Sequence, residues 1–159
     1  MIEIERKFLV TTNDYRDTAH RKSRIRQGFL STDKERTVRI RIKDDLGYIT
    51  VKGPSSQDGL SRFEWEKEIS KPEAEQLLEL CQPTLIDKFR YEVTINHHTF
   101  EVDEFLGANK GLIVAEVELE TINETFPVPQ WLGQEVTGNK RYYNSQLSLK
   151  PFNTWTSEK

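Results

Sequence analysis

Apolar and polar residues alternate with a period of two along most of the chain. Such alternation is typical of β-strands with one buried face, because successive side chains of a strand point to opposite sides. The stretches between them, such as residues 45–47 and 53–56, contain the Gly, Pro, Asp and Ser that favour turns. The pattern predicts eight strands, over residues 2–10, 24–31, 37–44, 48–53, 62–69, 86–95, 99–106 and 113–120.

Three stretches have helical spacing instead. The best marked covers residues 70–81, where Ser70 and Glu73 form a capping-box pattern and apolar residues then recur every three or four positions. Shorter helices are predicted over residues 14–22 and 143–150. The balance of elements favours an α+β fold, either an antiparallel barrel or a strongly curved sheet. No repeat, low-complexity stretch or linker divides the chain, so we expect one domain over residues 1–159.

The polar faces of the predicted strands carry mostly charged residues of both signs. Residues 37–43, TVRIRIK, place three aliphatic side chains on one face and three basic ones on the other. Residues 62–69 and 114–120 set carboxylates against their apolar faces in the same way. Solvated sheets also alternate, but Ser and Thr are scarce on these faces. We therefore expect the apolar faces to pack against helices and outer loops, and the charged faces to line a hydrated barrel interior where opposite charges compensate.

Composition agrees with a folded but highly charged domain. Charged residues make up 31% of the 159 positions, against about 25% in a typical domain, and three Trp, eight Phe and five Tyr can supply a core. The formal net charge of −3 gives no general attraction to nucleic acid or to an anionic membrane. No apolar run approaches the roughly 18 residues that cross a bilayer, and a mixed-charge segment follows Met1. We expect a cytoplasmic protein, either a monomer or a homodimer.

Carboxylates and cations recur at the two-residue spacing that places them on one strand face. Glu3, Glu5 and Lys7 share such a face, about 7 Å apart at each step, and residues 116 and 118 repeat the carboxylate pair. Two carboxylates so placed can share a divalent cation, and oxygen ligands alone favour Mg²⁺ or Mn²⁺. Cations on separate strands can hold several phosphate groups in line. The sequence thus predicts a site for a metal-bound polyphosphate, with Glu3, Glu5, Glu116 and Glu118 as carboxylates and Arg39, Arg41, Lys52, Lys88 and Arg90 as cations.

The residues EIERK, at positions 3–7, match the ExExK signature of the CYTH domain, or triphosphate tunnel metalloenzyme, superfamily. The chain is most similar to the short bacterial single-domain members. This resemblance implies an eight-stranded antiparallel barrel that forms a closed tunnel with helices outside, and metal-dependent attack on a phosphorus of a triphosphate bound in the tunnel. The similarity continues through TVRIRIK (37–43), ITVKGP (49–54), FEWEKEI (63–69), DKFRY (87–91), EVDEF (101–105), GLIVAEVELE (111–120) and WLGQEVTGNKRYYN (131–144).

The resemblance also implies roles for single residues. Asp103 is expected to assist a second metal or the attacking water, Glu64 and Glu66 to orient the cations or the metal, and either Lys140 or Arg141 to reach the tunnel mouth. Short bacterial members of the family commonly have a tyrosine, assigned as a proton acceptor, where this chain has Phe29, so that role is either dispensable or performed by another group. The implied metal ligands are Glu3, Glu5, Glu116 and Glu118, and the implied triphosphate clamp is Lys7, Arg39, Arg41, Lys52, Lys88 and Arg90.

The main expectation is therefore a hydrolase of inorganic tripolyphosphate or of a nucleoside triphosphate, with a small-molecule substrate as its partner. A class IV-like adenylyl cyclase is the second enzyme hypothesis, although no feature specifies an adenine or ribose pocket. A non-catalytic polyphosphate-binding module is the third hypothesis, and the complete carboxylate set argues against it.

Overall fold

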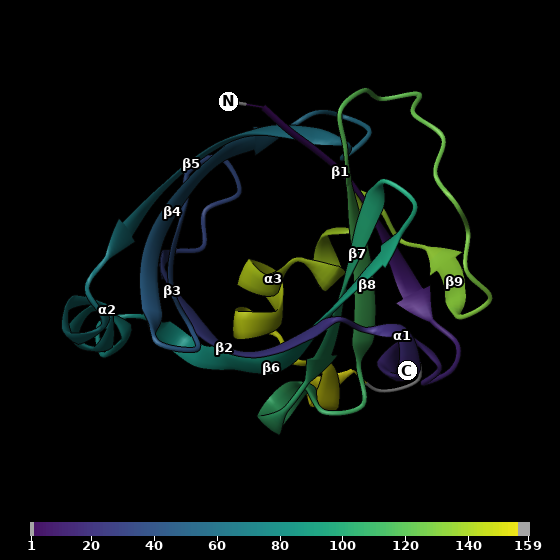
Figure 1. Ribbon diagram of the computed structural model, residues 1–159. Helices are drawn as coiled ribbons and strands as arrows, with labels where there is room; N and C mark the ends of the chain where they lie inside the picture. Colours follow the sequence, from purple (N-terminus) through teal and green to yellow (C-terminus); the bar gives the residue numbers. More distant parts are fainter. Residues whose placement is uncertain (1, 156–159) are drawn as a thin grey trace.

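The computed structural model describes residues 2–155, and nine antiparallel strands are its main elements (Figure 1). Eight of them close into a barrel in the order β5-β4-β3-β2-β6-β7-β8-β1, with β1 pairing back onto β5. The ninth, β9, pairs with the end of β1. Their bounds are β1 Ile2–Val10, β2 Arg21–Ser31, β3 Thr37–Lys43, β4 Leu46–Ser55, β5 Ser61–Ile69, β6 Gln82–Ile95, β7 His98–Phe105, β8 Ile113–Leu119 and β9 Leu132–Glu135.

All eight predicted strands are confirmed, and the barrel is closed rather than an open curved sheet. The sequence analysis missed β9, which has only four residues. Helix α2 (Lys71–Leu78) begins at the predicted capping box, in which the Glu73 N–H donates to Ser70 Oγ at 3.2 Å and the Ser70 N–H donates to Glu73 Oε1 at 3.0 Å. Helix α3 (Asn144–Leu149) is also confirmed.

The predicted helix over residues 14–22 is wrong over most of its length. Helix α1 spans only Tyr15–Thr18, and β2 begins at Arg21. Residues 21 and 22 pair with residues 92 and 91 of β6, and the alternation that starts there continues through the strand. Pairing with a long neighbouring strand therefore outweighs the local helical spacing.

Two apolar clusters lie outside the barrel, as predicted from the strand faces. Ala74 and Leu78 of α2 cover Ile40 and Ile42 of β3. On the other side, aromatic residues of α1 and of the segment before β9 cover strands β1, β6, β7 and β8. The ring of Trp131 contacts those of Tyr15 and Phe100 edge to face, with centroids 5.9 and 5.6 Å apart. The outer apolar faces of the strands are thus buried by short elements.

A third apolar cluster lies inside the barrel, and it corrects two expectations. Helix α3 enters the ring of strands instead of lying outside it (Figure 1). Its Leu147 packs with inward-facing side chains at one end of the barrel, so only part of the interior is charged. We call this cluster the apolar end; its buried members are Phe29, Ile86, Phe105, Leu112, Val114, Leu147 and Trp155.

The remaining elements are three short 3-10 helices, η1 (Gly107–Asn109), η2 (Lys140–Tyr142) and η3 (Phe152–Thr154), within the described residues. Over the same residues, every helix is too short and too polar to cross a lipid bilayer.

Candidate functional site

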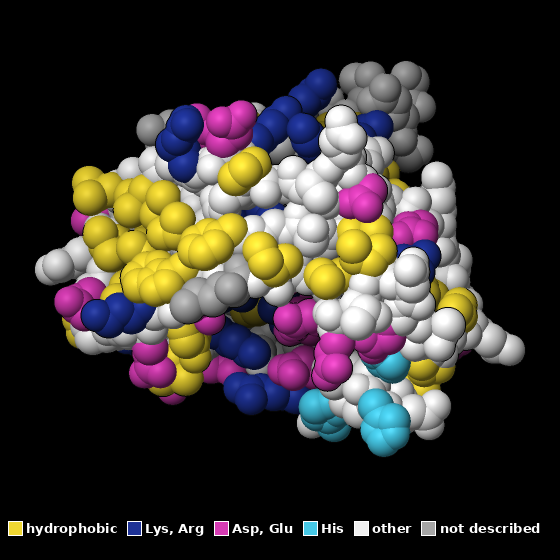
Figure 2. All heavy atoms as spheres, turned by 90° about the horizontal axis from the view of Figure 1, so that it is seen from above, with side chains coloured by type: hydrophobic (Ala, Val, Ile, Leu, Met, Phe, Trp, Pro, Cys, Tyr) yellow, Lys and Arg dark blue, Asp and Glu magenta, His cyan; other side chains and the backbone are white. Residues whose placement is uncertain are grey.

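A cavity of about 290 Å³ occupies the barrel interior beyond the apolar end, and we call it the lumen. Figure 2 shows Lys, Arg, Asp and Glu side chains gathered around a hollow in the molecular surface. The lumen is lined by every predicted metal-binding and triphosphate-clamp residue, together with Glu64 and Glu66. Strand pairing brings them together. Residues that are directly opposite on neighbouring strands share a face, so the partner of an inward-facing residue also faces inward. Examples are Glu5 opposite Glu118, and Lys7 opposite Glu116.

The carboxylates are concentrated on one side of the lumen. Glu5 and Glu116 of β1 and β8 share a hydrogen bond. Burial, together with the negative charges of Glu116 and Glu3, raises the pKa of Glu5 well above its usual value. Although burial opposes it, Lys7 and the hydrogen bond from Glu5 hold the pKa of Glu116 below its usual value. Adjacent negative charges repel, so the pKa values of these two buried carboxyl groups are shifted in opposite directions.

This carboxylate pair fits a divalent cation, whose charge would relieve the repulsion between the two groups. Within residues 2–155, no three His, Cys, Asp or Glu side chains already stand together as a metal site. Mg²⁺ does not need such a cage, because it commonly uses one or two carboxylates and completes its shell with phosphate oxygens and water. Oxygen-only donors also fit Mn²⁺.

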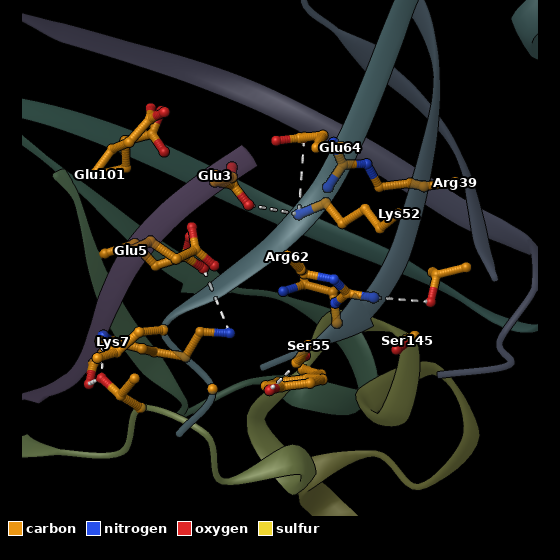
Figure 3. Close-up of a pocket in the computed structure, with 18 of the residues that line it drawn as sticks. Glu3, Glu5, Lys7, Arg39, Lys52, Ser55, Arg62, Glu64, Glu101 and Ser145 are labelled. Carbon is orange, nitrogen blue, oxygen red and sulfur yellow. Dashed lines mark hydrogen bonds and ion pairs between the residues drawn. The ribbon is translucent and has the colours of Figure 1, made fainter. Parts of the chain in front are cut away.

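Glu3 lies beside this pair and contacts a cation from another strand. Figure 3 shows the Lys52 ammonium between Glu3 and Glu64, at 3.3 Å from Glu3 Oε1 and 3.9 Å from Glu64 Oε1. Burial raises the pKa of Glu3, and Lys52 opposes this. Glu118 is solvent-exposed but still lines the lumen.

Cations of the lumen lie on β3, which is on the opposite side of the ring, and on β6, which is two strands from β8. In the ring of eight strands, β3 lies four strands from β8 in either direction. Arg39 Nη2 contacts Thr50 Oγ1 at 3.1 Å and Glu66 Oε2 at 3.5 Å. Its buried Nε has no hydrogen-bond acceptor in the described part of the chain. A buried guanidinium N–H without an acceptor is costly, so this donor is suited to an anionic ligand.

Asp103 lies behind the cations and does not line the lumen. Arg90 donates to both of its carboxylate oxygens, at 2.8 and 2.9 Å, and the Lys88 ammonium lies 2.8 Å from Oδ2. The positive charges of Arg90 and Lys88 lower the pKa of Asp103 to about 2, although burial alone would raise it. Burial and the nearby Arg90 and Arg41 lower the pKa of Lys88 to about 7. The Lys88 ammonium is thus close to losing its proton at neutral pH.

Several lumen residues were missed by the sequence analysis. Arg62 shares a strand face with Glu64 and Glu66, so the period of two could have assigned it to the site. Asn144 is the first residue of α3 and Tyr143 precedes it, so no strand pattern could place either residue in the lumen. The Lys7 ammonium lies 5.0 Å from the centroid of the Tyr143 ring. Helix α3 therefore supplies part of the lumen as well as the apolar end.

Three further residues complete the comparison with the expectations. Phe29 is buried between the lumen and the apolar end, and its ring cannot exchange a proton. Lys140 and Arg141, of which one was expected at the tunnel mouth, are not among the residues that line the lumen. Both line a separate cavity instead, where the Arg141 guanidinium lies 3.8 Å from the centroid of the Trp155 ring.

Comparison with known proteins identifies similar sequences and folds. A CYTH domain family model matches residues 1–150. An inorganic triphosphatase of Acetivibrio thermocellus is 47% identical over 151 residues, which cover 94% of this chain and 95% of that protein. An inorganic triphosphatase of Nitrosomonas europaea is 37% identical over 153 residues, covering 94% and 98%. The crystal structure of an inorganic triphosphatase is similar with a TM-score of 0.67 at 34% identity, covering 92% of this chain and 97% of that one.

Proposed function

The chain belongs to the CYTH domain family, and from this premise we propose that it hydrolyses inorganic tripolyphosphate or a nucleoside triphosphate in the lumen. One observation carries the proposal: carboxylates on β1 and β8 line the same cavity as guanidinium groups on β3, on the opposite side of the ring, and as Lys88 and Arg90 on β6, two strands from β8. A triphosphate between the two sides would contact the cations with its oxygens, and a metal on the carboxylates. The similarity to two inorganic triphosphatases supports the inorganic substrate.

The proposed metal is Mg²⁺ or Mn²⁺, held by Glu5 and Glu116 with Glu3 and Glu118 beside them. A bound divalent cation would neutralise charge on the phosphate oxygens and so lower the barrier to attack on phosphorus. The fit rests on the closeness of Glu5 and Glu116, since two adjacent buried carboxyl groups gain from a cation that relieves their mutual repulsion.

The proposed task of the cations is to bind and orient the phosphate groups. Phosphoryl transfer needs mainly positioning and charge neutralisation, and guanidinium groups can bind phosphate oxygens in pairs. Arg39 has a buried N–H donor that no described acceptor uses. The proposed clamp is Lys7, Arg39, Arg41, Lys52, Lys88 and Arg90, with Arg62 added from the structure.

The supporting carboxylates have different proposed tasks. Both oxygens of Asp103 already accept from Arg90 or Lys88, so we propose that it fixes these two cations. Glu66 accepts a hydrogen bond from Thr50 Oγ1 at 2.7 Å and lies 3.5 Å from Arg39 Nη2, so its proposed task is to orient Arg39. Glu64 is placed to orient Lys52.

A phosphate-release screen tests the proposal. The purified protein is assayed with tripolyphosphate, ATP, GTP and thiamine triphosphate, each with Mg²⁺, with Mn²⁺ and with a chelator. We expect release of orthophosphate that needs a divalent metal. Formation of cyclic AMP and pyrophosphate from ATP would support a cyclase instead. Tight, metal-independent binding of tripolyphosphate in calorimetry, without release from any substrate, would support a binding module and reject the hydrolase.

A further inference from the structure

Two neutral side chains link the cations of the lumen. Arg41 Nε donates to Gln27 Oε1 at 2.8 Å, and Gln27 Nε2 donates to Asn144 Oδ1 at 3.0 Å. The same Asn144 oxygen accepts from the Lys88 ammonium at 2.8 Å. A continuous chain of hydrogen bonds therefore runs from β3 through β2 and α3 to β6.

The chain of hydrogen bonds joins groups of like charge in a buried place. Lys88 is 1% exposed and Gln27 is fully buried. Arg41 and Arg90 both lie close enough to lower the pKa of Lys88, and Asp103 is the carboxylate in direct contact with it. An amide carbonyl can accept a hydrogen bond from a cation without cancelling its charge, whereas a carboxylate would neutralise it.

We propose that Gln27 and Asn144 are positioning residues of the triphosphate site, which fix Arg41 and Lys88 relative to each other without adding a further negative charge beside them. This rests on the proposed function, because it assumes that the lumen cations bind a triphosphate. Neither residue is charged, so no charge pattern in the sequence pointed to them.

The apolar end determines where Asn144 lies. Asn144 is the first residue of α3, and Leu147 of the same helix is fully buried in the apolar cluster. Ser148 donates from Oγ to the Thr84 carbonyl oxygen of β6 at 2.7 Å. These contacts hold α3 inside the barrel, so the amide of Asn144 is presented to Lys88 by a rigid element.

The test uses two variants of Asn144 and a control on the same helix. Asn144→Ala removes the acceptor, and Asn144→Asp keeps its shape but adds a negative charge. Gln146→Ala is the matched control, because Gln146 carries the same amide but lines the separate cavity and not the lumen. Circular dichroism and thermal unfolding confirm that each variant is folded, and Asn144→Asp keeps the test valid if the alanine variant does not fold.

The first measurement is the titration of the Lys88 ammonium in ligand-free protein. NMR of protein with isotope-labelled lysine monitors the titration, and a Lys88→Arg variant identifies the Lys88 signal. The groups that face Lys88 are Asp103, Arg90, Arg41 and Glu116. Without the Asn144 oxygen the ammonium loses an acceptor, so we expect its titration midpoint to fall in Asn144→Ala. In Asn144→Asp the added carboxylate should raise the midpoint. A role limited to packing would not produce shifts of opposite direction.

The second measurement is tripolyphosphate hydrolysis as a function of pH. Loss of a hydrogen bond to a charged group predicts a KM about 10-fold higher in Asn144→Ala, with a smaller change in kcat, and values close to the wild type in Gln146→Ala. A Lys88 midpoint that is unchanged in both Asn144 variants, or that moves in the same direction in both, would overturn the proposal. If the wild type hydrolyses no triphosphate, the proposed function fails, while the Lys88 titration still decides whether Asn144 positions that cation.

Discussion

The two ends of the barrel interior are built from the same strands but from opposite kinds of residue. Ile86 and Lys88 lie two residues apart on the same face of β6, and they are equally buried, at 0% and 1% exposure. Ile86 packs in the apolar end, whereas Lys88 needs Asp103 and Asn144 at 2.8 Å each. The same change from an apolar to a polar residue, two positions apart on one strand, occurs between Phe29 and Gln27 on β2 and between Phe105 and Asp103 on β7.

This contrast separates stability from chemistry within one fold. Burying a large apolar side chain stabilises a protein by about 1.5–3 kcal/mol. Burying a charge is costly even when the charge is paired, so the lumen contributes little to stability, and its proposed task is ligand binding. Substitutions in the lumen should therefore lower activity more than stability, and substitutions at the apolar end should do the reverse.

The largest expected effect is loss of turnover in Glu5→Gln. We expect hydrolysis to fall by roughly 10³-fold, since a metal ligand would be lost and metal-assisted charge stabilisation accounts for several kcal/mol. The fold should remain, because glutamine has nearly the shape of glutamate and its amide can donate a hydrogen bond to Glu116. Phosphate release and thermal unfolding measure the two quantities. Glu120→Gln, at an exposed carboxylate that does not line the lumen, is the matched control. Near-normal hydrolysis of every triphosphate by Glu5→Gln would reject the metal assignment.

The opposite effect is expected from Leu147→Ala at the apolar end. Leu147 is fully buried, so its truncation should lower the free energy of unfolding by about 2–5 kcal/mol. Hydrolysis by the folded protein, measured well below the unfolding temperature, should fall far less than in Glu5→Gln. Leu149→Ala, on the same helix but 47% exposed, should change stability by less than about 0.5 kcal/mol. Denaturant unfolding measures the free energy of unfolding of both variants. Equal losses of stability in the two variants would contradict the assignment of this cluster as a core.

An effect on stability of similar size is expected in the pH dependence that comes from Lys88. Its pKa of about 7 in the folded protein lies below the usual value of about 10.4, so between these pH values the unfolded chain binds more protons than the folded one. Stability rises with pH where the unfolded state binds more protons. The free energy of unfolding of the wild type, relative to Lys88→Met, should therefore increase from pH 7 to pH 10. A flat or falling difference would show that Lys88 keeps its proton when buried.

The period of two was sufficient for the strands and for most of the lumen residues, but it left a barrel and a strongly curved sheet open, and the closed barrel was implied by the family resemblance. Alternation locates the strands and places their charged residues on one face. In a closed barrel that whole face lies either inside or outside. The same rule could have included Arg62, which has that spacing from Glu64. It could not locate Asn144 or Tyr143, because they reach the lumen through the docking of α3 by Leu147, a tertiary contact. It also could not show where along β6 the inner face changes from charged to apolar, since Ile86 follows the same alternation as Lys88.

The smallest expected effect is that of Phe29→Tyr, at the boundary between the two ends. Phe29 is 3% exposed, pairs opposite Arg39 and contacts both the lumen and the apolar cluster. The added hydroxyl is placed at the edge of a polar cavity, so it can find a partner and should cost less than about 1 kcal/mol of stability. We expect kcat for tripolyphosphate to change by less than about threefold, because positioning and charge neutralisation dominate phosphoryl transfer and neither needs a phenol here. Steady-state kinetics across pH 6–9 measures this. A rise of tenfold or more, with a new ionisation in the pH profile, would show that this lumen lacks a proton acceptor that the tyrosine restores.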